Sequence, residues 1–217
     1  MELPFTATEF FAAFAAYNTA VWPLQLVFLA SGLFVVATLA RTRSKGAAST
    51  VLAGLWLWMG LVYHWRFFAP INPAARGFAL VFVAAAATFA WFGLSERRLD
   101  APVVGTRRLA GWTLIAYAIV GYPLLAYLAG QHYPAVPTFG LPCPTTIFTL
   151  GALLLVSSTT PVFLFVIPLL WSAIGTLGAV RLGVVEDYGL GAAGLVTLAL
   201  LAAQHRRSPS PHLQVAS

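Results

Sequence analysis

Residues 77–94 decide the fold, and they read GFALVFVAAAATFAWFGL without a charged residue. A run this apolar is long enough to cross a bilayer as a helix, which takes about 20 residues. In the 217-residue chain, 60% of residues are hydrophobic and 8% are charged, whereas a soluble domain carries about 25% charged residues. Because so apolar a chain cannot cover itself with polar surface in water, the sequence predicts an all-α polytopic membrane helix bundle.

Apolar runs predict about seven transmembrane helices within a single transmembrane domain, residues 1–204. The predicted spans are roughly 19–40, 48–68, 73–95, 109–129, 144–159, 161–180 and 186–204. The fifth span is short and lies between Pro144 and Pro161, so we expect it to be buried among other helices rather than to face lipid. The polar residues 205–217 contain Ser-Pro repeats and predict a disordered cytoplasmic tail.

A short helix is predicted before the first span, at residues 4–18. Thr6 and Glu9 have the spacing of a capping box, and Phe5 and Phe10 have the spacing of a hydrophobic staple. Aromatic residues then recur at helical spacing along this segment. We therefore expect the helix to lie flat at the membrane interface.

The distribution of basic residues predicts the orientation in the membrane. Nine of the twelve lysines and arginines fall on one side of the predicted bundle, namely Arg41, Arg43, Lys45, Arg97, Arg98, Arg107, Arg108, Arg206 and Arg207. Because basic residues gather in cytoplasmic loops, the N-terminus is predicted outside and the C-terminus in the cytoplasm of a multi-pass protein of the cell inner membrane. The lipid bilayer is the expected partner. No nucleic-acid partner is expected, since no aromatic and basic groove is visible.

The unusual polar residues concentrate in the connections predicted to lie outside. They define a candidate outward-facing polar site of Tyr63, His64, Arg66, Asn72, His132, Tyr133, Cys143, Thr145, Glu186 and Asp187. Ionisable groups near membrane depth are costly, and they often mark functional sites. A second group in the first predicted span, Asn18, Trp22 and Gln25, predicts either the lining of a polar cavity or hydrogen bonds between helices.

Three of these residues carry the donor atoms of a metal site. His64, His132 and Cys143 have nitrogen and sulfur ligands that zinc or copper would use, and no other cofactor is indicated. Their spacing matches no metal motif, so the favoured interpretation of the histidines is that they are interfacial residues bonded to backbone or water. For Cys143, the favoured interpretation is a small apolar residue in a tight turn. Glu186 and Asp187 suit the N-terminal turn of the last span, where acids favour the helix dipole.

Three blocks of the sequence, residues 4–23, 55–74 and 137–151, are long and unusual in composition. They resemble a bacterial family of multi-pass inner-membrane proteins of unknown function. The resemblance extends to about the last predicted span. It implies a small inner-membrane protein and carries neither an activity nor catalytic residues.

Three classes of function remain open. A permease or channel-like protein for a small solute is favoured, because a proline-broken short span and repeat-like second and fourth spans are typical of transporters. The alternative is a membrane enzyme or metal-binding protein with an outward-facing site built from histidine, cysteine and carboxylate. The third class is an accessory subunit or homo-oligomer, which the small residues Gly189, Gly191 and Gly194 of the last span would suit.

Overall fold

The computed structural model describes residues 3–41, 45–95 and 102–207, and within these ranges the fold is all-α. The α-helices are α1 (Ala7–Val21), α2 (Leu24–Ala40), α3 (Lys45–Trp58), α4 (Ala75–Leu94), α5 (Gly105–Ala116), α6 (Tyr122–Leu128), α7 (Pro142–Val156), α8 (Phe163–Leu182) and α9 (Tyr188–Arg207). Two π-helical segments, η1 (Met59–Phe68) and η2 (Tyr117–Gly121), continue α3 and α5. A 3-10 turn, η3 (Val185–Asp187), precedes α9.

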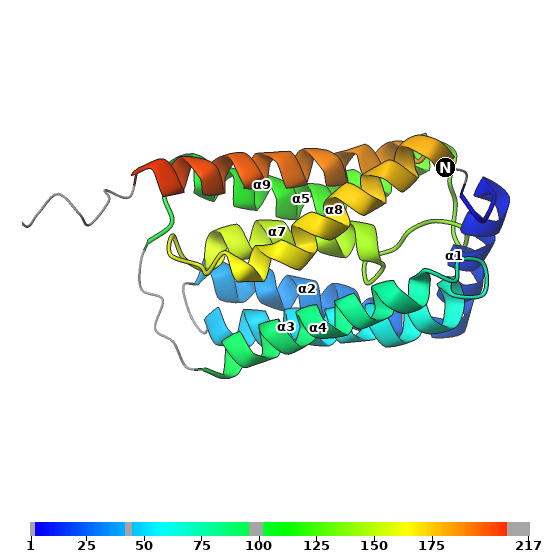
Figure 1. Ribbon diagram of the computed structural model, residues 1–217, viewed down its shortest axis with the longest axis horizontal. Helices are drawn as coiled ribbons and strands as arrows, with labels where there is room; N and C mark the ends of the chain where they lie inside the picture. Colours follow the sequence, from blue (N-terminus) through cyan, green and yellow to red (C-terminus); the bar gives the residue numbers. More distant parts are fainter. Residues whose placement is uncertain (1–2, 42–44, 96–101, 208–217) are drawn as a thin grey trace, which may run out of the picture.

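The helices form a bundle that is closed at one end by α1. Figure 1 shows α2, α3, α4, α5, α7, α8 and α9 running along the long axis, while α1 lies across the end on the right. The helical stretches long and apolar enough to cross a membrane are Gly46–Phe68, Ala75–Leu94, Gly105–Leu128, Phe163–Leu182 and Val185–Arg206. Within the described residues, five of the seven predicted spans therefore reach membrane-spanning length.

The two remaining predicted spans are shorter helices. α1 and α2 would count as a sixth span only as a bent pair, because the chain turns by 90° between them. The predicted first span, 19–40, thus begins later than expected, since α1 continues to Val21 and α2 starts at Leu24 after Pro23. α7 is apolar but too short to pass the same test.

The lateral surface of the bundle is apolar. Leu80, Leu195 and Leu177 are 66%, 70% and 67% exposed, and similar side chains stand out on α2, α6 and α8. A soluble protein rarely exposes so continuous an apolar surface, whereas lipid solvates it well. This surface and the five helical stretches of membrane-spanning length suggest a membrane protein.

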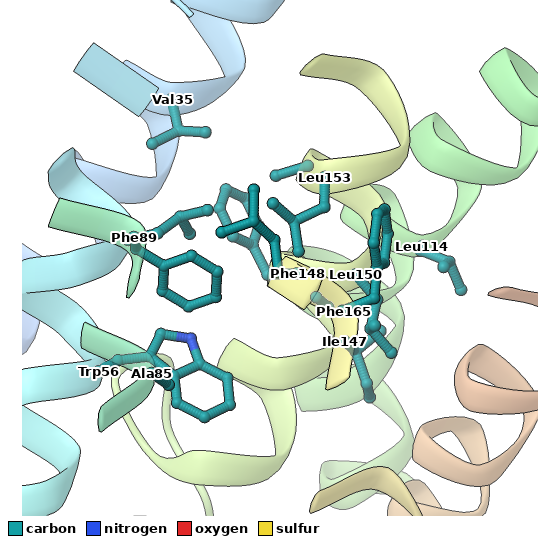
Figure 2. Packing of buried hydrophobic residues seen from close by; sticks show 14 of the residues in the cluster. Val35, Trp56, Ala85, Phe89, Leu114, Ile147, Phe148, Leu150, Leu153 and Phe165 are labelled. Carbon is teal, nitrogen blue, oxygen red and sulfur yellow. The ribbon is translucent and has the colours of Figure 1, made fainter. Parts of the chain in front are cut away.

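α7 is the buried centre of the bundle. Every residue of α7 except Leu155 is buried, and Figure 2 shows its Ile147, Phe148 and Leu150 among apolar side chains of the surrounding helices. A β-carbon at Gly151 would lie 2.7 Å from the Gly111 carbonyl oxygen, so α5 can approach α7 only because both residues are glycine. The prediction that the short fifth span is buried among other helices is confirmed.

The predicted N-terminal signals are present in α1. The Glu9 amide donates to Thr6 Oγ1 at 3.3 Å, and the Thr6 amide donates to Glu9 Oε2 at 2.8 Å, which completes a capping box. The Phe5 and Phe10 rings stack with their centroids 5.8 Å apart. α1 also packs inward, because its buried Tyr17 contacts the Tyr63 ring of η1 at 5.6 Å. It therefore caps the bundle as well as lying across its end.

The opposite end of the bundle collects the C-terminal ends of α2, α4, α7 and α9 (Figure 1). The described basic residues at this end are Arg41, Arg107, Arg108 and Arg206. Arg43, Arg97 and Arg98 lie outside the described residues, as do the side chains of Lys45 and Arg207 and the predicted tail from 208 onward. The described arginines are thus placed as the charge pattern predicted.

Candidate functional site

A pocket of about 320 Å³ lies at the α1 end of the bundle. Its walls are mostly apolar and come from α1, η1, α4, α7 and α8 together with the connections beside them. The aromatic wall residues are Phe5, Phe10, Phe14, Tyr63, Phe68, Phe78 and Trp171. The size and the apolar lining are those of sites that bind small molecules.

Asp187 and Cys143 are two of the buried residues with polar side-chain atoms that line this pocket. The Tyr122 hydroxyl donates to Asp187 Oδ1 at 2.5 Å, and the Cys143 thiol lies beside the same carboxylate. Asp187 is 2% exposed. Within the described ranges, no lysine, arginine or histidine pairs with it at ion-pair distance. The pocket therefore contains a carboxylate whose charge no described basic side chain neutralises.

The sequence around each residue explains this arrangement. Pro142 and Pro144 flank Cys143 in the first turn of α7, where a missing backbone N–H is tolerated. The same prolines remove amide donors that a carboxylate near this helix end would otherwise accept. Asp187 ends η3 directly before α9, so the N-terminal dipole of α9 favours its negative charge.

Glu186 adds a second buried carboxylate beside the first. It is fully buried, and Gln131 Nε2 donates to its Oε2 at 3.2 Å. Its Oε1 has no hydrogen-bond partner among the described residues. The Tyr117 hydroxyl donates to the Glu186 backbone carbonyl at 2.7 Å, which holds η3 against η2. Two adjacent carboxyl groups are therefore buried at this end of the bundle.

His64 lies behind the pocket wall and not at the interface. It is fully buried, and neither ring nitrogen has a hydrogen-bond partner among the described residues. Its ring centroid lies 4.5 Å from that of Phe82 and 5.0 Å from that of Trp171, which itself lines the pocket. The alternative interpretation, an interfacial histidine bonded to backbone, does not describe this side chain.

Asn18 and Gln25 are not among the residues that line this pocket. Gln25 Nε2 donates to Asn18 Oδ1 at 2.7 Å, so the pair bridges α1 and α2. Asn18 Nδ2 donates to the carbonyls of Pro134 and Val136, both at 2.7 Å, in the connection between α6 and α7. Trp22 is 58% exposed on the outside. The residues instead satisfy the hydrogen-bonding interpretation, because the bend after α1 turns them toward this connection.

The other members of the predicted polar site are distributed over the α1 end. Asn72 lines the pocket and accepts from the Ala74 amide at 3.2 Å, and buried Thr145 accepts from the Gly140 amide at 3.0 Å. Arg66 is exposed, with its guanidinium 6.0 Å from the Phe67 ring centroid. The exposed Tyr133 donates to the Asn18 backbone carbonyl at 3.2 Å. Of the predicted set, Tyr63, Asn72, Cys143 and Asp187 line the pocket.

The predicted zinc or copper ligands are not assembled. Within the described residues, no group of three or more His, Cys, Asp and Glu side chains is placed to hold a metal ion. His132 is exposed and packs on the Tyr127 ring, with centroids 5.1 Å apart. Cys143 is buried beside Asp187 at the far end of the same connection. The connection separates the two ligands because its start faces outward and its end enters the bundle.

Sequence reasoning did not identify Tyr122, Phe78 or Trp171. All three lie within long apolar runs, where an aromatic residue is an ordinary sign of packing or of a membrane interface. Two of the glycines of the last span, which the sequence analysis considered for contact with a partner subunit, have close contacts within the chain. A β-carbon at Gly189 would overlap the Tyr117 ring, and one at Gly194 would overlap the Ser172 hydroxyl, so these positions serve packing within the chain.

These features define an all-α protein with helices long and apolar enough to cross a membrane, a largely apolar pocket at one end and a buried carboxylate within it. The chain matches a family of unknown function, DUF6064, over residues 7–211, and it belongs to that family. No curated protein and no solved structure matches the chain.

Proposed function

We propose that the protein binds a small, largely apolar molecule in the α1-end pocket, with Asp187 and Cys143 as its polar contacts. The observation that carries the proposal is a pocket of about 320 Å³ in which a buried carboxylate interrupts a mostly apolar wall that includes seven aromatic rings. A few convergent polar groups in an apolar pocket orient a ligand, while the apolar area supplies affinity.

The pocket is accessible from the surface of the bundle. Its lining extends from Cys143 and Asp187 inside to Leu177 and Arg181, which are exposed near the C-terminal end of α8. Leu3 and Phe5, before α1, form the opposite rim. An apolar ligand would reach the carboxylate from this mouth without crossing the packed core.

The favoured permease is less well supported than a binding site. Asn18 and Gln25, which a solute path was expected to follow, are bonded to each other and to the connection before α7. The centre of the bundle is filled by fully buried side chains such as Trp56 and Phe148. We therefore propose ligand binding, by a receptor or by an enzyme acting on the bound molecule, in preference to a continuous channel.

The membrane arrangement that suits this function places the α1 end outside and the C-terminus in the cytoplasm of a bacterial inner membrane. α2 and α7 would complete seven crossing elements. The exposed arginines at the end opposite α1 support this orientation by the positive-inside rule. The pocket would then open toward the outer face.

The single cysteine of the chain provides the test, because labelling at Cys143 reports only on the pocket. The protein in lipid nanodiscs is treated with methyl methanethiosulfonate, and the added mass is followed by mass spectrometry. Gly178→Leu places a larger side chain in the pocket at a position where a β-carbon meets nothing within 4 Å. We expect labelling of this variant to be slower by about fivefold or more, since access limits thiol reaction.

Gly54→Leu is the matched control, because Gly54 is exposed on α3 and a β-carbon there also meets nothing within 4 Å. Its labelling rate should equal that of the wild type. A saturating neutral probe, neopentylbenzene, should slow wild-type labelling as Gly178→Leu does. If neither the probe nor Gly178→Leu changes the rate, the pocket is not a binding site and the proposal fails.

A further inference from the structure

We propose that the molecule bound in this pocket carries a positive charge, and that the pocket selects a lipophilic amine or quaternary ammonium over a neutral molecule of the same shape. The inference rests on the proposed function and names its ligand class. It follows from the combination of a carboxylate without a basic partner and seven aromatic rings in the apolar wall.

The first observation is the charge at the inner side of the pocket. Asp187 accepts from the neutral Tyr122 hydroxyl and lies beside the neutral Cys143 thiol. Glu186, next to it, is held by the neutral Gln131 amide. Neutral donors and the α9 N-terminus stabilise an anion without cancelling its charge. A buried carboxylate without a paired cation is costly, and a cationic ligand would remove that cost.

The second observation is the aromatic wall. Seven aromatic side chains, from Phe5 to Trp171 along the sequence, line the pocket. Aromatic rings attract cations through the negative charge of their faces, and groups of rings recognise quaternary ammonium ions that cannot donate hydrogen bonds. An aliphatic wall would provide equal apolar area without this attraction. The wall therefore favours an organic cation over an inorganic ion, which would lose its hydration shell here.

Arg181 is the basic residue of the lining, and its position is compatible with a cationic ligand. It is exposed in the last turn of α8, whereas Asp187 is buried. Water screens the charge of an exposed guanidinium much more than that of a buried carboxylate. The charge that Asp187 carries when it is ionised is therefore screened less than the charge of Arg181.

The test compares two probes of the same shape. Benzyltrimethylammonium and neopentylbenzene differ only in the replacement of the quaternary nitrogen by carbon. Each is titrated against the labelling rate of Cys143 in nanodiscs, and the concentration that halves the rate is recorded for the wild type and for Asp187→Asn. Each variant is normalised to its own unprotected rate. Because both proteins share one bilayer composition, partitioning of the neutral probe into lipid cancels.

For Asp187→Asn, we expect the half-protecting concentration of the cation to rise about tenfold or more, while that of the neutral probe changes less than about twofold. Equal changes for both probes would overturn the cation inference and leave the proposed function standing. Failure of both probes to protect the wild type would overturn both proposals.

A measurement on the wild type alone covers the case in which Asp187→Asn does not fold. Tetramethylammonium and tert-butanol are similar in size and both remain in water. Better protection of Cys143 by tetramethylammonium supports the cation inference, and equal or weaker protection overturns it. Gly178→Leu should abolish protection by either compound, because it fills the site without changing the charge of Asp187.

Discussion

Two ionisable side chains, Arg107 and Asp187, lie at opposite ends of the buried helix α7. They differ in the hydrogen-bond partners that surround them. At the C-terminal end, Arg107 Nε donates to the Leu154 carbonyl at 3.0 Å, and its terminal nitrogens donate to the Ser157 carbonyl at 2.9 Å and to Gln204 Oε1 at 2.5 Å. At the N-terminal end, Asp187 receives only side-chain donors. The arginine is enclosed by partners within the chain, whereas the carboxylate lies in a pocket.

The difference follows from what each end of α7 offers. The last carbonyls of a helix need donors, and an arginine supplies several in a fixed geometry. The first turn of α7 contains Pro142 and Pro144, which have no N–H to give a carboxylate. A charge with a complete set of partners holds the fold together, while a charge with an incomplete set is available to a ligand. This contrast predicts which substitutions affect stability and which affect binding.

The first prediction concerns Asn18. Like Arg107, Asn18 has a side chain that is fully hydrogen-bonded within the chain. Asn18→Leu removes its bonds to two carbonyls of the α6–α7 connection and to Gln25 and Thr138. Since buried carbonyls are left without donors, we expect a loss of about 4 kcal/mol in the free energy of unfolding, read from thermal unfolding in detergent. A variant as stable as the wild type would show that this bonding does not hold the connection.

The second prediction tests the comparison itself. Arg107→Met keeps the apolar stem but removes the three bonds, so it should cost about 3 kcal/mol in the same assay. Asp187→Asn retains an acceptor for Tyr122 and should cost less than about 1 kcal/mol. If the two substitutions destabilise equally, the carboxylate is a structural group and the comparison breaks down.

The third prediction contrasts two glycines on neighbouring helices. A β-carbon at Gly194 of α9 would overlap the Ser172 hydroxyl of α8, so Gly194→Ala should lower stability by about 2 kcal/mol. A β-carbon at Gly178 meets nothing within 4 Å, and Gly178→Ala should be neutral or stabilising by up to about 1 kcal/mol, since alanine favours helix. Equal melting temperatures for the two variants would mean that the α8–α9 contact is looser than described.

The smallest effect is expected at the α1 capping box. Thr6→Ala removes the acceptor of the Glu9 amide and should cost about 1 kcal/mol at neutral pH. Hydrogen bonds from the Thr6 amide and hydroxyl hold the pKa of the Glu9 carboxyl below its usual range. The part of the box that needs charged Glu9 is therefore present above the usual glutamate pKa and is lost as the pH falls through the lowered value. A stability difference between wild type and Thr6→Ala that grows on acidification would contradict this sign.

The features that the sequence predicted correctly are local. The capping box of α1 depends on residues three apart, and the ends of α4 and α8 lie within a few residues of the predicted spans because apolar runs end where charge or proline begins. The burial of α7 followed from its length. These features need no knowledge of which helices touch.

The pocket depends on contacts between distant residues, which a single sequence does not reveal. Tyr122 meets Asp187 only because α6 packs beside η3, and Trp171 becomes a wall residue only because α8 runs along the bundle toward the α1 end. The placement of the three predicted metal ligands depends on such contacts as well, since His132 and Cys143 are close in sequence but face different surroundings. Asn18 and Gln25 were correctly predicted to be neighbours. Their hydrogen bonds to the α6–α7 connection depend on the bend after α1, which the sequence analysis did not predict.

One measurement tests the central claim most directly, namely the melting temperature of the protein in nanodiscs with and without benzyltrimethylammonium. A ligand that binds only the folded state at 100 times its Kd adds about 2.7 kcal/mol, which raises Tm by about 5–10 °C for a chain of this size. The account predicts that rise for the wild type and for Gly54→Leu, a rise about half as large or smaller for Asp187→Asn, and no rise for Gly178→Leu. An unchanged wild-type Tm, or an equal rise in Asp187→Asn, would contradict it.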